Sequence, residues 1–244
     1  MRRLFINNPQ KSLVVDGDNH KHLSVVLRSR VGDSVLVCCG DGFDYNYTIS
    51  SISKNSSVLE LVDKVENLSE PAISVTLFHA VCKGEKNETI ARMATELGLD
   101  CICPIITEFT IAKPDSYKVE RLQRVALEAA KQSGRGKVPS VVAPIKFADM
   151  LTKLSNFDLT VFPYEGECNV SLQQYLVGVF TERPHNIKTI AIIVGSEGGF
   201  SKTEAQALIN ANITPVTLGK RILRADTAAA MVCAIVMCAG GQMQ

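Results

Sequence analysis

The spacing of apolar residues divides the chain into two parts with different patterns. Over the first 70 residues, short β-rich segments are separated by turn residues such as Gly32-Asp33 and Gly40-Asp41-Gly42. The predicted strands cover residues 3–6, 34–39, 45–53 and 57–65, and one helix begins at a cap on Asp18 and continues through residue 27. Closely spaced short strands with a single helix predict a small β-barrel.

From residue 72 onward, apolar strands alternate with segments of helical periodicity. The predicted strands cover residues 73–81, 101–106, 159–162, 189–194 and 216–218. The predicted helices cover residues 88–97, 119–133, 147–154, 172–180, 201–210 and 226–239. This alternation predicts an α/β domain with a mostly parallel sheet that helices cover on both faces. We place the domain boundary in the linker at residues 67–71, between domains 1–70 and 72–244.

Two loops near the C-terminus each follow a short apolar strand and each lead into a helix. The first is Val194-Gly-Ser-Glu-Gly-Gly-Phe-Ser-Lys-Thr-Glu204, in which Ser201 and Glu204 have the spacing of a capping box. It does not match the glycine spacing of the common phosphate-binding motifs. On its own, this loop is better interpreted as a structural turn. Two such junctions are, however, what a ligand crevice at the carboxyl edge of a parallel sheet requires.

The second loop, Leu218-Gly-Lys-Arg-Ile-Leu-Arg-Ala-Asp-Thr-Ala228, places three cations where a helix begins. The positive end of the helix dipole disfavours cations at this position. Asp226 or Thr227 is expected to cap the helix. An unfavourable cluster of this kind is typical of a functional site that binds something anionic.

Charge is unevenly distributed, although the whole chain carries a net charge of only +1. Residues 1–70 carry eight Lys or Arg and nine Asp or Glu, whereas residues 113–146 carry eight basic and three acidic residues. Residues 218–244 have three basic residues and one acidic residue. Local positive charge in a balanced protein indicates a polyanion-binding surface, and a solvated helix face is the alternative.

Composition narrows the class of protein further. The hydrophobic content of 46% supports a sizeable core, and the longest apolar run is too short to span a bilayer. No secretory signal is apparent, so we expect a cytoplasmic protein with no membrane contact. The eight cysteines include no CxxC pair, so we expect reduced thiols acting as small hydrophobic residues and no metal site.

Five segments in order resemble motifs of the RsmE family of ribosomal RNA methyltransferases, a branch of the SPOUT class. The two C-terminal loops resemble that family's GPEGGFS and LGxRILRxETA signatures. The other three are His20-Lys-His-Leu23 with Val26-Leu-Arg28, Lys83-Gly-Glu-Lys86 with Ala94-Thr-Glu-Leu-Gly98, and Glu128-Ala-Ala-Lys-Gln-Ser-Gly-Arg135 with Val138-Pro139.

The resemblance implies an N-terminal PUA-like β-barrel that binds RNA and a C-terminal SPOUT methyltransferase domain with a trefoil knot. It also implies a homodimer, S-adenosyl-L-methionine as methyl donor, and N3 of a uridine in small-subunit (16S) ribosomal RNA as acceptor. The substrate would be ribosomal RNA or the small ribosomal subunit.

Site residues follow from the same motifs, together with the chemistry of the side chains. We expect Arg224 and Glu197 to be catalytic: Arg224 stabilises charge on the uracil oxygens, and Glu197 orients the cofactor or base edge or acts as general base. The expected RNA-binding residues are Arg3, His22, Arg28, Gln132 and Arg135. The expected cofactor-binding residues are Phe162, Pro163, Glu165, Gly195, Glu197, Gly198, Gly199, Leu218, Gly219, Ile222, Leu223, Arg224 and Thr227.

The sequence departs from the family pattern at several of these positions. Ser196 replaces a proline, Asp226 replaces a glutamate, and Lys21 changes the histidine pair of the first motif. Phe109 stands where a basic residue is common, which removes one expected RNA or active-site contact.

Two other classes of function compete with this interpretation. A non-catalytic RNA-binding ribosome assembly factor could keep the same fold without turnover. A nucleotide-hydrolysing α/β protein is disfavoured because the chain has no Walker lysine motif.

Overall fold

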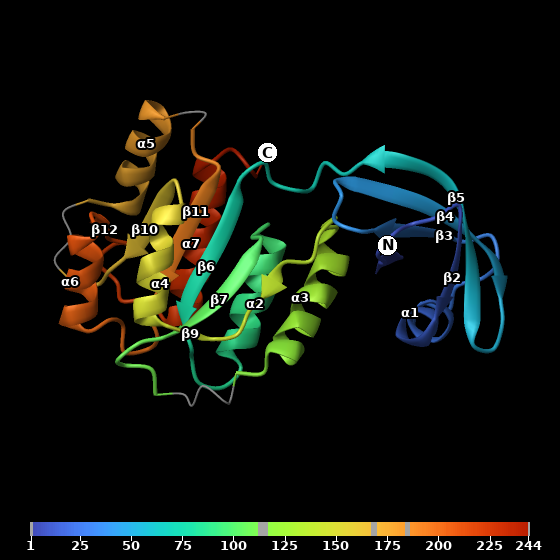
Figure 1. Cartoon of the computed structure of the whole chain (residues 1–244), viewed down its shortest axis with the longest axis horizontal. Helices are drawn as coiled ribbons and strands as arrows, with labels where there is room; N and C mark the ends of the chain where they lie inside the picture. Colours follow the sequence, from blue (N-terminus) through green and yellow to red (C-terminus); the bar gives the residue numbers. More distant parts are fainter. Residues whose placement is uncertain (1, 112–116, 167–169, 184–185, 244) are drawn as a thin grey trace. The chain divides into compact units, whose positions relative to one another are not determined.

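The computed structural model describes residues 2–111, 117–166, 170–183 and 186–243, and its contacts divide the chain into two compact units (Figure 1). Unit 1 comprises residues 1–70 together with residues 130–138, and unit 2 comprises residues 71–129 and 139–244. The segment 130–138 therefore belongs with the N-terminal unit, although it follows 59 residues of unit 2 in the sequence.

Unit 1 is built on a five-stranded sheet with strand order β1-β3-β4-β5-β2. The strands are β1 (Arg3–Phe5), β2 (Ser12–Asp16), β3 (Ser34–Cys38), β4 (Phe43–Ile52) and β5 (Ser56–Glu66). The pair β1–β3 is parallel and the other pairs are antiparallel. Buried Leu4, Val37, Tyr47, Ile49 and Leu59 form the centre of the unit's apolar core.

The start of the chain differs from the predicted pattern in one strand and one helix. β2 was not predicted, although Gly17, which has a left-handed φ of +53°, follows it directly and marks its end. The helix α1 (Gly17–Lys21) continues into a π-helical turn, His22–Val26, in which the Leu27 amide donates to the His22 carbonyl. π-Helical turns are rare in proteins, and those that do occur are often found at functional sites.

Unit 2 contains a seven-stranded sheet in which every pair of neighbouring strands is parallel. Its strand order is β12-β10-β11-β6-β7-β8, and β9 also pairs with β7. The strands are β6 (Ser74–Ala80), β7 (Cys101–Ile106), β8 (Ser140–Val141), β9 (Ile145–Lys146), β10 (Leu159–Pro163), β11 (Thr189–Val194) and β12 (Pro215–Val216). The predicted parallel sheet is confirmed, and the two-residue strands β8 and β9 are additions.

Helices cover both faces of this sheet, as predicted. The helices are α2 (Lys86–Glu96), α3 (Val119–Ser133), α4 (Phe147–Lys153), α5 (Leu172–Glu182), α6 (Lys202–Asn210) and α7 (Ala225–Ala239). On one face, Met150 of α4 and Leu208 of α6 pack in a core cluster with Phe78 and Ile193 of the sheet. On the other face, α2 and α7 pack beside Leu77.

Helix ends follow the local sequence signals with one exception. The Ser201–Glu204 capping box is present at the start of α6, and Gly98 and Gly134 have the left-handed φ values expected after helix C-termini. The predicted cap of α7 is wrong: the N-cap is Arg224, and it makes no side-chain capping hydrogen bond. Asp226 instead lies within the first turn, where it cannot act as the N-cap.

The topology brings three loops to one edge of the sheet. Strands β12, β10 and β11 are neighbours and run in the same direction, so their carboxyl ends lie side by side. The segments that leave them begin after Pro163, Val194 and Val216. Ligands of parallel α/β sheets bind at such carboxyl edges.

Candidate functional site

The three loops enclose one cavity in unit 2 at the carboxyl edge of the sheet. Eighteen residues line it: Pro163, Tyr164, Glu165, Val194, Gly195, Ser196, Glu197, Gly199, Phe200, Thr217, Leu218, Gly219, Lys220, Arg221, Ile222, Leu223, Ala225 and Ala228. Because glycines and exposed backbone contribute much of this wall, main-chain amides and carbonyls are available to a ligand.

Two glycines of the first loop are required, Gly195 by the close approach of neighbouring backbone and Gly199 by its left-handed backbone conformation. A Cβ atom added at Gly195 would lie 3.0 Å from the Gly199 Cα and 3.1 Å from the Phe200 ring. Gly199 has a left-handed φ of +66°, and a Cβ atom there would collide with the Glu165 carboxylate. The loop is therefore folded tightly on itself, and the space beside it stays open only without side chains.

Most of the residues predicted to bind a cofactor line this cavity. They are Pro163, Glu165, Gly195, Glu197, Gly199, Leu218, Gly219, Ile222 and Leu223. Four predicted residues are not part of the lining, namely Phe162, Gly198, Arg224 and Thr227.

Each of these four has a different position. Phe162 is fully buried beneath the site, with its ring stacked on Tyr164 at 5.4 Å and edge-on to Phe200 at 5.5 Å. Gly198 faces Phe109, because a Cβ atom there would lie 3.0 Å from the Phe109 Cβ. Arg224 lines an adjoining cavity, and Thr227 is exposed on the first turn of α7.

The lining also contains residues of these three loops that were not among the individually predicted cofactor-binding residues. Among them are Tyr164, which follows β10, and the exposed cations Lys220 and Arg221. The sequence did indicate a site role for Lys220 and Arg221, because cations cluster at the start of α7, where the helix dipole disfavours them. Tyr164 carried no such signal, because its place depends on how β10 pairs with β12.

A second cavity adjoins the first and has a more charged lining. It is lined by Lys86, Glu197, Ile222, Leu223, Arg224 and Ala225, four of which also line the first cavity. Lys86 is the first residue of α2 and lies 111 positions before Glu197 in the sequence. Glu197 thus stands where the glycine-lined cavity meets a cavity with two cations.

The Glu197 carboxylate is held by Lys86. The Lys86 ammonium donates to Glu197 Oε1 at 2.6 Å. Partial burial by itself raises the pKa of Glu197. The hydrogen bond and the charge of Lys86, together with backbone amides that include that of Lys83, have the larger effect, so the pKa of Glu197 lies below its ordinary value. The same hydrogen bond raises the pKa of Lys86. Both groups are therefore charged at neutral pH.

The departures from the family pattern at Ser196 and Phe109 are linked in the structure. The Ser196 hydroxyl donates to the Phe109 carbonyl at 3.3 Å, and Phe109 also packs against Gly198. Phe109 therefore braces the glycine loop. At the other departure, Asp226 Oδ1 is buried without a hydrogen-bond partner among the described residues.

The five predicted RNA-binding residues all belong to unit 1. This includes Gln132, which lies near the end of α3, and Arg135, which follows that helix. Arg28 and Gln132 are exposed, and His22 is half-buried. Arg3 and Arg135 are buried, with 4% and 2% of their surface exposed. The prediction that these two arginines contact RNA does not fit their burial, because each guanidinium is occupied by a carboxylate.

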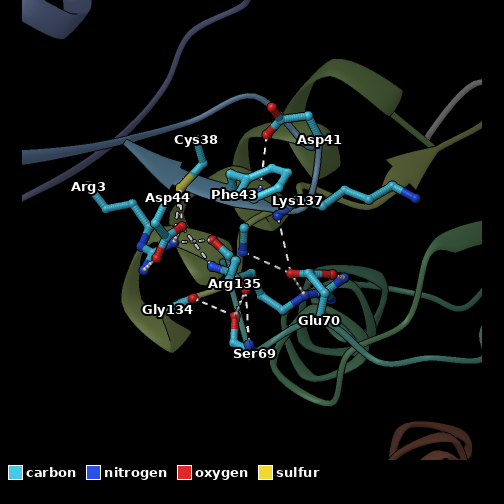
Figure 2. A network of polar contacts seen from close by, with 12 residues as sticks. Arg3, Cys38, Asp41, Phe43, Asp44, Ser69, Glu70, Gly134, Arg135 and Lys137 are labelled. Carbon is cyan, nitrogen blue, oxygen red and sulfur yellow. Dashed lines mark hydrogen bonds and ion pairs between the residues drawn. The ribbon is translucent and has the colours of Figure 1, made fainter. Parts of the chain in front are cut away.

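Figure 2 shows the network that holds the two buried arginines. Arg3 donates to both oxygens of Asp44 at 3.2 Å and to the Arg135 carbonyl at 2.9 Å. Arg135 makes a two-point contact with Glu70, with both bonds at 2.8 Å, and the Gly136 amide also donates to Glu70. The network holds the segment after α3 within unit 1. The positive charge of Arg135 is therefore used in an ion pair that stabilises this unit.

We expect Glu70→Ala to lower the free energy of unfolding of unit 1 by about 1–3 kcal/mol, because it removes the carboxylate that contacts the buried Arg135 guanidinium at two points and accepts from the Gly136 amide. Arg135→Met should be milder, since Glu70 is partly exposed and can be hydrated. Chemical denaturation of the full chain measures both. Equal, small effects of both variants would contradict a structural role for the pair.

Arg28 is held in a strained backbone conformation directly after the π-helical turn. Its φ is +49°, and the neighbouring Ser29 amide donates to the Leu23 carbonyl. A left-handed conformation at a residue other than glycine costs roughly 1 kcal/mol and points to a functional requirement.

Arg28→Gly should therefore change stability and RNA affinity in opposite directions. We expect unit 1 to become more stable by up to about 1 kcal/mol. RNA binding should weaken, and the slope of log K against log salt should fall by about 0.7–0.9 if one phosphate contact is lost. Unchanged RNA affinity together with the gain in stability would exclude Arg28 from the RNA surface.

Four of the seven described cysteines are buried as expected, whereas Cys39 and Cys101 are partly exposed and Cys238 is exposed. Cys38, Cys82, Cys103 and Cys233 are buried, and burial raises the pKa of each thiol to about 12. Cys168 lies outside the described residues. No group of three or more potential metal ligands occurs in the described part of the chain.

Comparison with known proteins gives consistent matches over both units. A family model described as an RNA methyltransferase domain matches residues 69–237, and one described as an RNA methyltransferase PUA domain matches residues 15–62. The fold is thus an α/β methyltransferase fold with an N-terminal PUA domain. None of the described helices is long and apolar enough to cross a membrane.

Individual relatives agree with the family models. The chain is 34% identical to a protein of Synechocystis sp. named ribosomal RNA small subunit methyltransferase E, over 85% of this chain and 66% of that protein. A protein of the same name from Rickettsia conorii is 31% identical over 93% of this chain and 91% of its own length. A crystal structure of a Neisseria gonorrhoeae protein of that name, bound to S-adenosyl methionine, is 27% identical, with a TM-score of 0.84 and coverage of 98% and 97%.

Proposed function

This chain belongs to the RNA methyltransferase family that includes the proteins named ribosomal RNA small subunit methyltransferase E, and we propose that it transfers a methyl group from S-adenosyl-L-methionine to N3 of a uridine in small-subunit ribosomal RNA. The observation that carries this proposal is the pair of adjoining cavities at the carboxyl edge of the sheet. One is built from glycine-rich backbone, and the other is lined by Lys86, Glu197 and Arg224.

The first cavity fits a methyl donor of this kind. Its wall includes a cradle that a Cβ atom at Gly195 or Gly199 would fill, and the carboxylates of Glu165 and Glu197 can accept hydrogen bonds from hydroxyl and ammonium groups. When bound, S-adenosyl-L-methionine supplies an activated methyl group on a positively charged sulfur. Backbone groups at Gly195, Gly199 and Leu218 would hold it, with Glu197 at the boundary to the second cavity.

The second cavity would receive the acceptor base. Uridine N3 carries a proton that must leave, and negative charge then spreads to the carbonyl oxygens of the base. Arg224 stabilises this charge, and Glu197 orients the base edge. Because N3 is engaged when uridine is paired, the target nucleotide is unpaired or turned out of its stack when it binds.

We also propose the finer features that the family resemblance implies. These are binding of ribosomal RNA or the small subunit through unit 1, a homodimer, a cytoplasmic location, and a trefoil knot in the C-terminal part of unit 2. In support of the knot, β12 returns to pair with the side of β10 that faces away from β11, and α7 then packs against β11 and α2.

The decisive experiment maps methylated uridines in ribosomal RNA from cells that lack this protein, before and after the gene is restored. We expect one N3-methyluridine of small-subunit RNA to disappear and to return. Purified protein with labelled S-adenosyl-L-methionine and undermethylated subunits should restore the same position. A stoichiometric complex with RNA and no methyl transfer to any substrate would instead favour the non-catalytic assembly factor.

A further inference from the structure

We propose that the cavity lined by Lys86, Glu197 and Arg224 selects uracil over cytosine by its hydrogen-bonding edge, and that Lys86 is a specificity-determining residue that contacts the base in this selection. The inference rests on the proposed function and assigns a role to a residue outside the two glycine-containing loops.

Three separate chain segments bring these side chains together. Lys86 begins α2, Glu197 lies between β11 and α6, and Arg224 precedes α7. They supply every charged group in the lining of this cavity, whose other members Ile222, Leu223 and Ala225 are apolar. A base that enters therefore meets two cationic donors and one anionic acceptor against an apolar wall.

This set of groups complements the edge of uracil. Lys86 and Arg224 can only donate hydrogen bonds, and the Glu197 carboxylate can only accept them. Uracil presents two carbonyl acceptors on either side of its N3–H donor, so each of its three groups finds an opposite partner. Cytosine presents an amino donor in place of one carbonyl and an acceptor at N3. It would set a donor against a cation and an acceptor against the carboxylate.

The present contact of Lys86 indicates how the site responds to a base. Its ammonium lies 2.6 Å from Glu197 Oε1, and in the proposed complex it turns this donor to a uracil carbonyl, which frees the carboxylate for the N3–H group. Cys82 and Asp226 are the other titratable groups that act on Lys86, and the Lys83 amide acts on Glu197. Loss of the Lys86 hydrogen bond removes a main cause of the low pKa of Glu197, so the carboxylate becomes more basic as the base arrives.

Proton and methyl transfer then follow in order. Glu197 accepts the N3 proton while Lys86 and Arg224 stabilise the charge on the carbonyl oxygens. The proton and the methyl carbon use the same in-plane position at N3, so the protonated Glu197 must turn aside before the methyl group is transferred. The N3 lone pair then forms the bond to the methyl carbon as the carbon–sulfur bond breaks, with its electrons staying on sulfur. Glu197 finally releases its proton to water.

The test uses the full-length protein with undermethylated small subunits, or target RNA carrying U or C at the methylated position. For Lys86→Met we expect the single-turnover rate on U to fall by about 10- to 100-fold and the U-over-C preference to fall at least about tenfold. Lys86→Arg should recover part of both, because it keeps a cationic donor. The acid limb of the pH–rate profile should move to higher pH in Lys86→Met, since Glu197 loses the cation that lowers its pKa.

Controls separate this inference from the proposed function. Lys202→Met also replaces a lysine at the first position of a helix, and because Lys202 is exposed and lines neither cavity, it should retain the wild-type rate. Calorimetry should show unchanged affinity for S-adenosyl-L-methionine in all of these variants. A Lys86→Met protein with wild-type rate and wild-type preference for U would overturn the role of Lys86 alone. A wild-type protein that methylates no uridine at N3 would instead overturn the proposed function.

Discussion

Arg224→Ala is expected to lower the rate of methyl transfer by about 10²–10³-fold, the usual effect of removing one group that stabilises transition-state charge. Arg224 lines the charged cavity and is exposed at the N-cap of α7 without making a capping hydrogen bond. Since a cation at a helix N-terminus is unfavourable, its removal should not reduce the free energy of unfolding. Single-turnover methylation, together with calorimetric binding of S-adenosyl-L-methionine, distinguishes a loss of chemistry from a loss of cofactor binding.

Two further variants sharpen this result. Arg224→Lys keeps the charge but loses the planar fork of donors, so an intermediate rate is expected. Arg92→Ala removes another exposed arginine, whose ion pair with Glu96 lies on the surface of α2, and should leave the rate unchanged. An Arg224→Ala protein that works at the wild-type rate would remove Arg224 from the mechanism.

The elements of unit 2 were predictable because their sequence signals are strong and local. A parallel strand buried on both faces is a continuous apolar run, as in residues 101–106 and 189–194, and both predicted ranges match the observed strands. Glycine stops and the Ser201 capping box then fixed several helix ends. The first loop could be found for the same reason, since it follows β11, whose range was predicted correctly. The strand before the second loop was predicted at 216–218 and is observed at Pro215–Val216, so its position was only approximate.

Features that depend on distant contacts were not predictable. Arginine is usually a surface residue, so nothing in the sequence indicated that Arg3 and Arg135 are buried against Asp44 and Glu70. The cap of α7 was placed two or three residues too late, because Asp226 and Thr227 are good capping residues by type but the helix begins at Ala225.

The charged cavity shows the same limit at the site itself. Lys86 could be read as part of a family motif, but its contact with Glu197 joins residues 111 positions apart. No spacing rule links two such positions. The fold supplies the link, because β6 and β11 are paired and the loops that follow them meet above the sheet.

Gly195→Ala is expected to weaken binding of S-adenosyl-L-methionine by at least about tenfold, which corresponds to about 1.4 kcal/mol. A Cβ atom at this position would lie 3.0–3.1 Å from the backbone of Gly199 and the ring of Phe200, which are not flexible side-chain ends that could move aside. The loop must open, and this displaces Gly199 and the cavity wall that it forms. Calorimetric titration of the variant with S-adenosyl-L-methionine measures the effect.

The matched control for this variant is Gly178→Ala in α5, where an added Cβ atom meets nothing within 4 Å. It makes the same chemical change inside a helix, so it should raise the free energy of unfolding by about 0.5–1 kcal/mol and leave cofactor binding unchanged. The two alanine variants thus separate the loss of a glycine from the loss of the space beside it. If Gly195→Ala binds S-adenosyl-L-methionine as tightly as Gly178→Ala does, the close packing of the loop is not what forms the cofactor site. In that case, the carboxylates and the segment after β12 must hold the cofactor without the shape of the glycine loop.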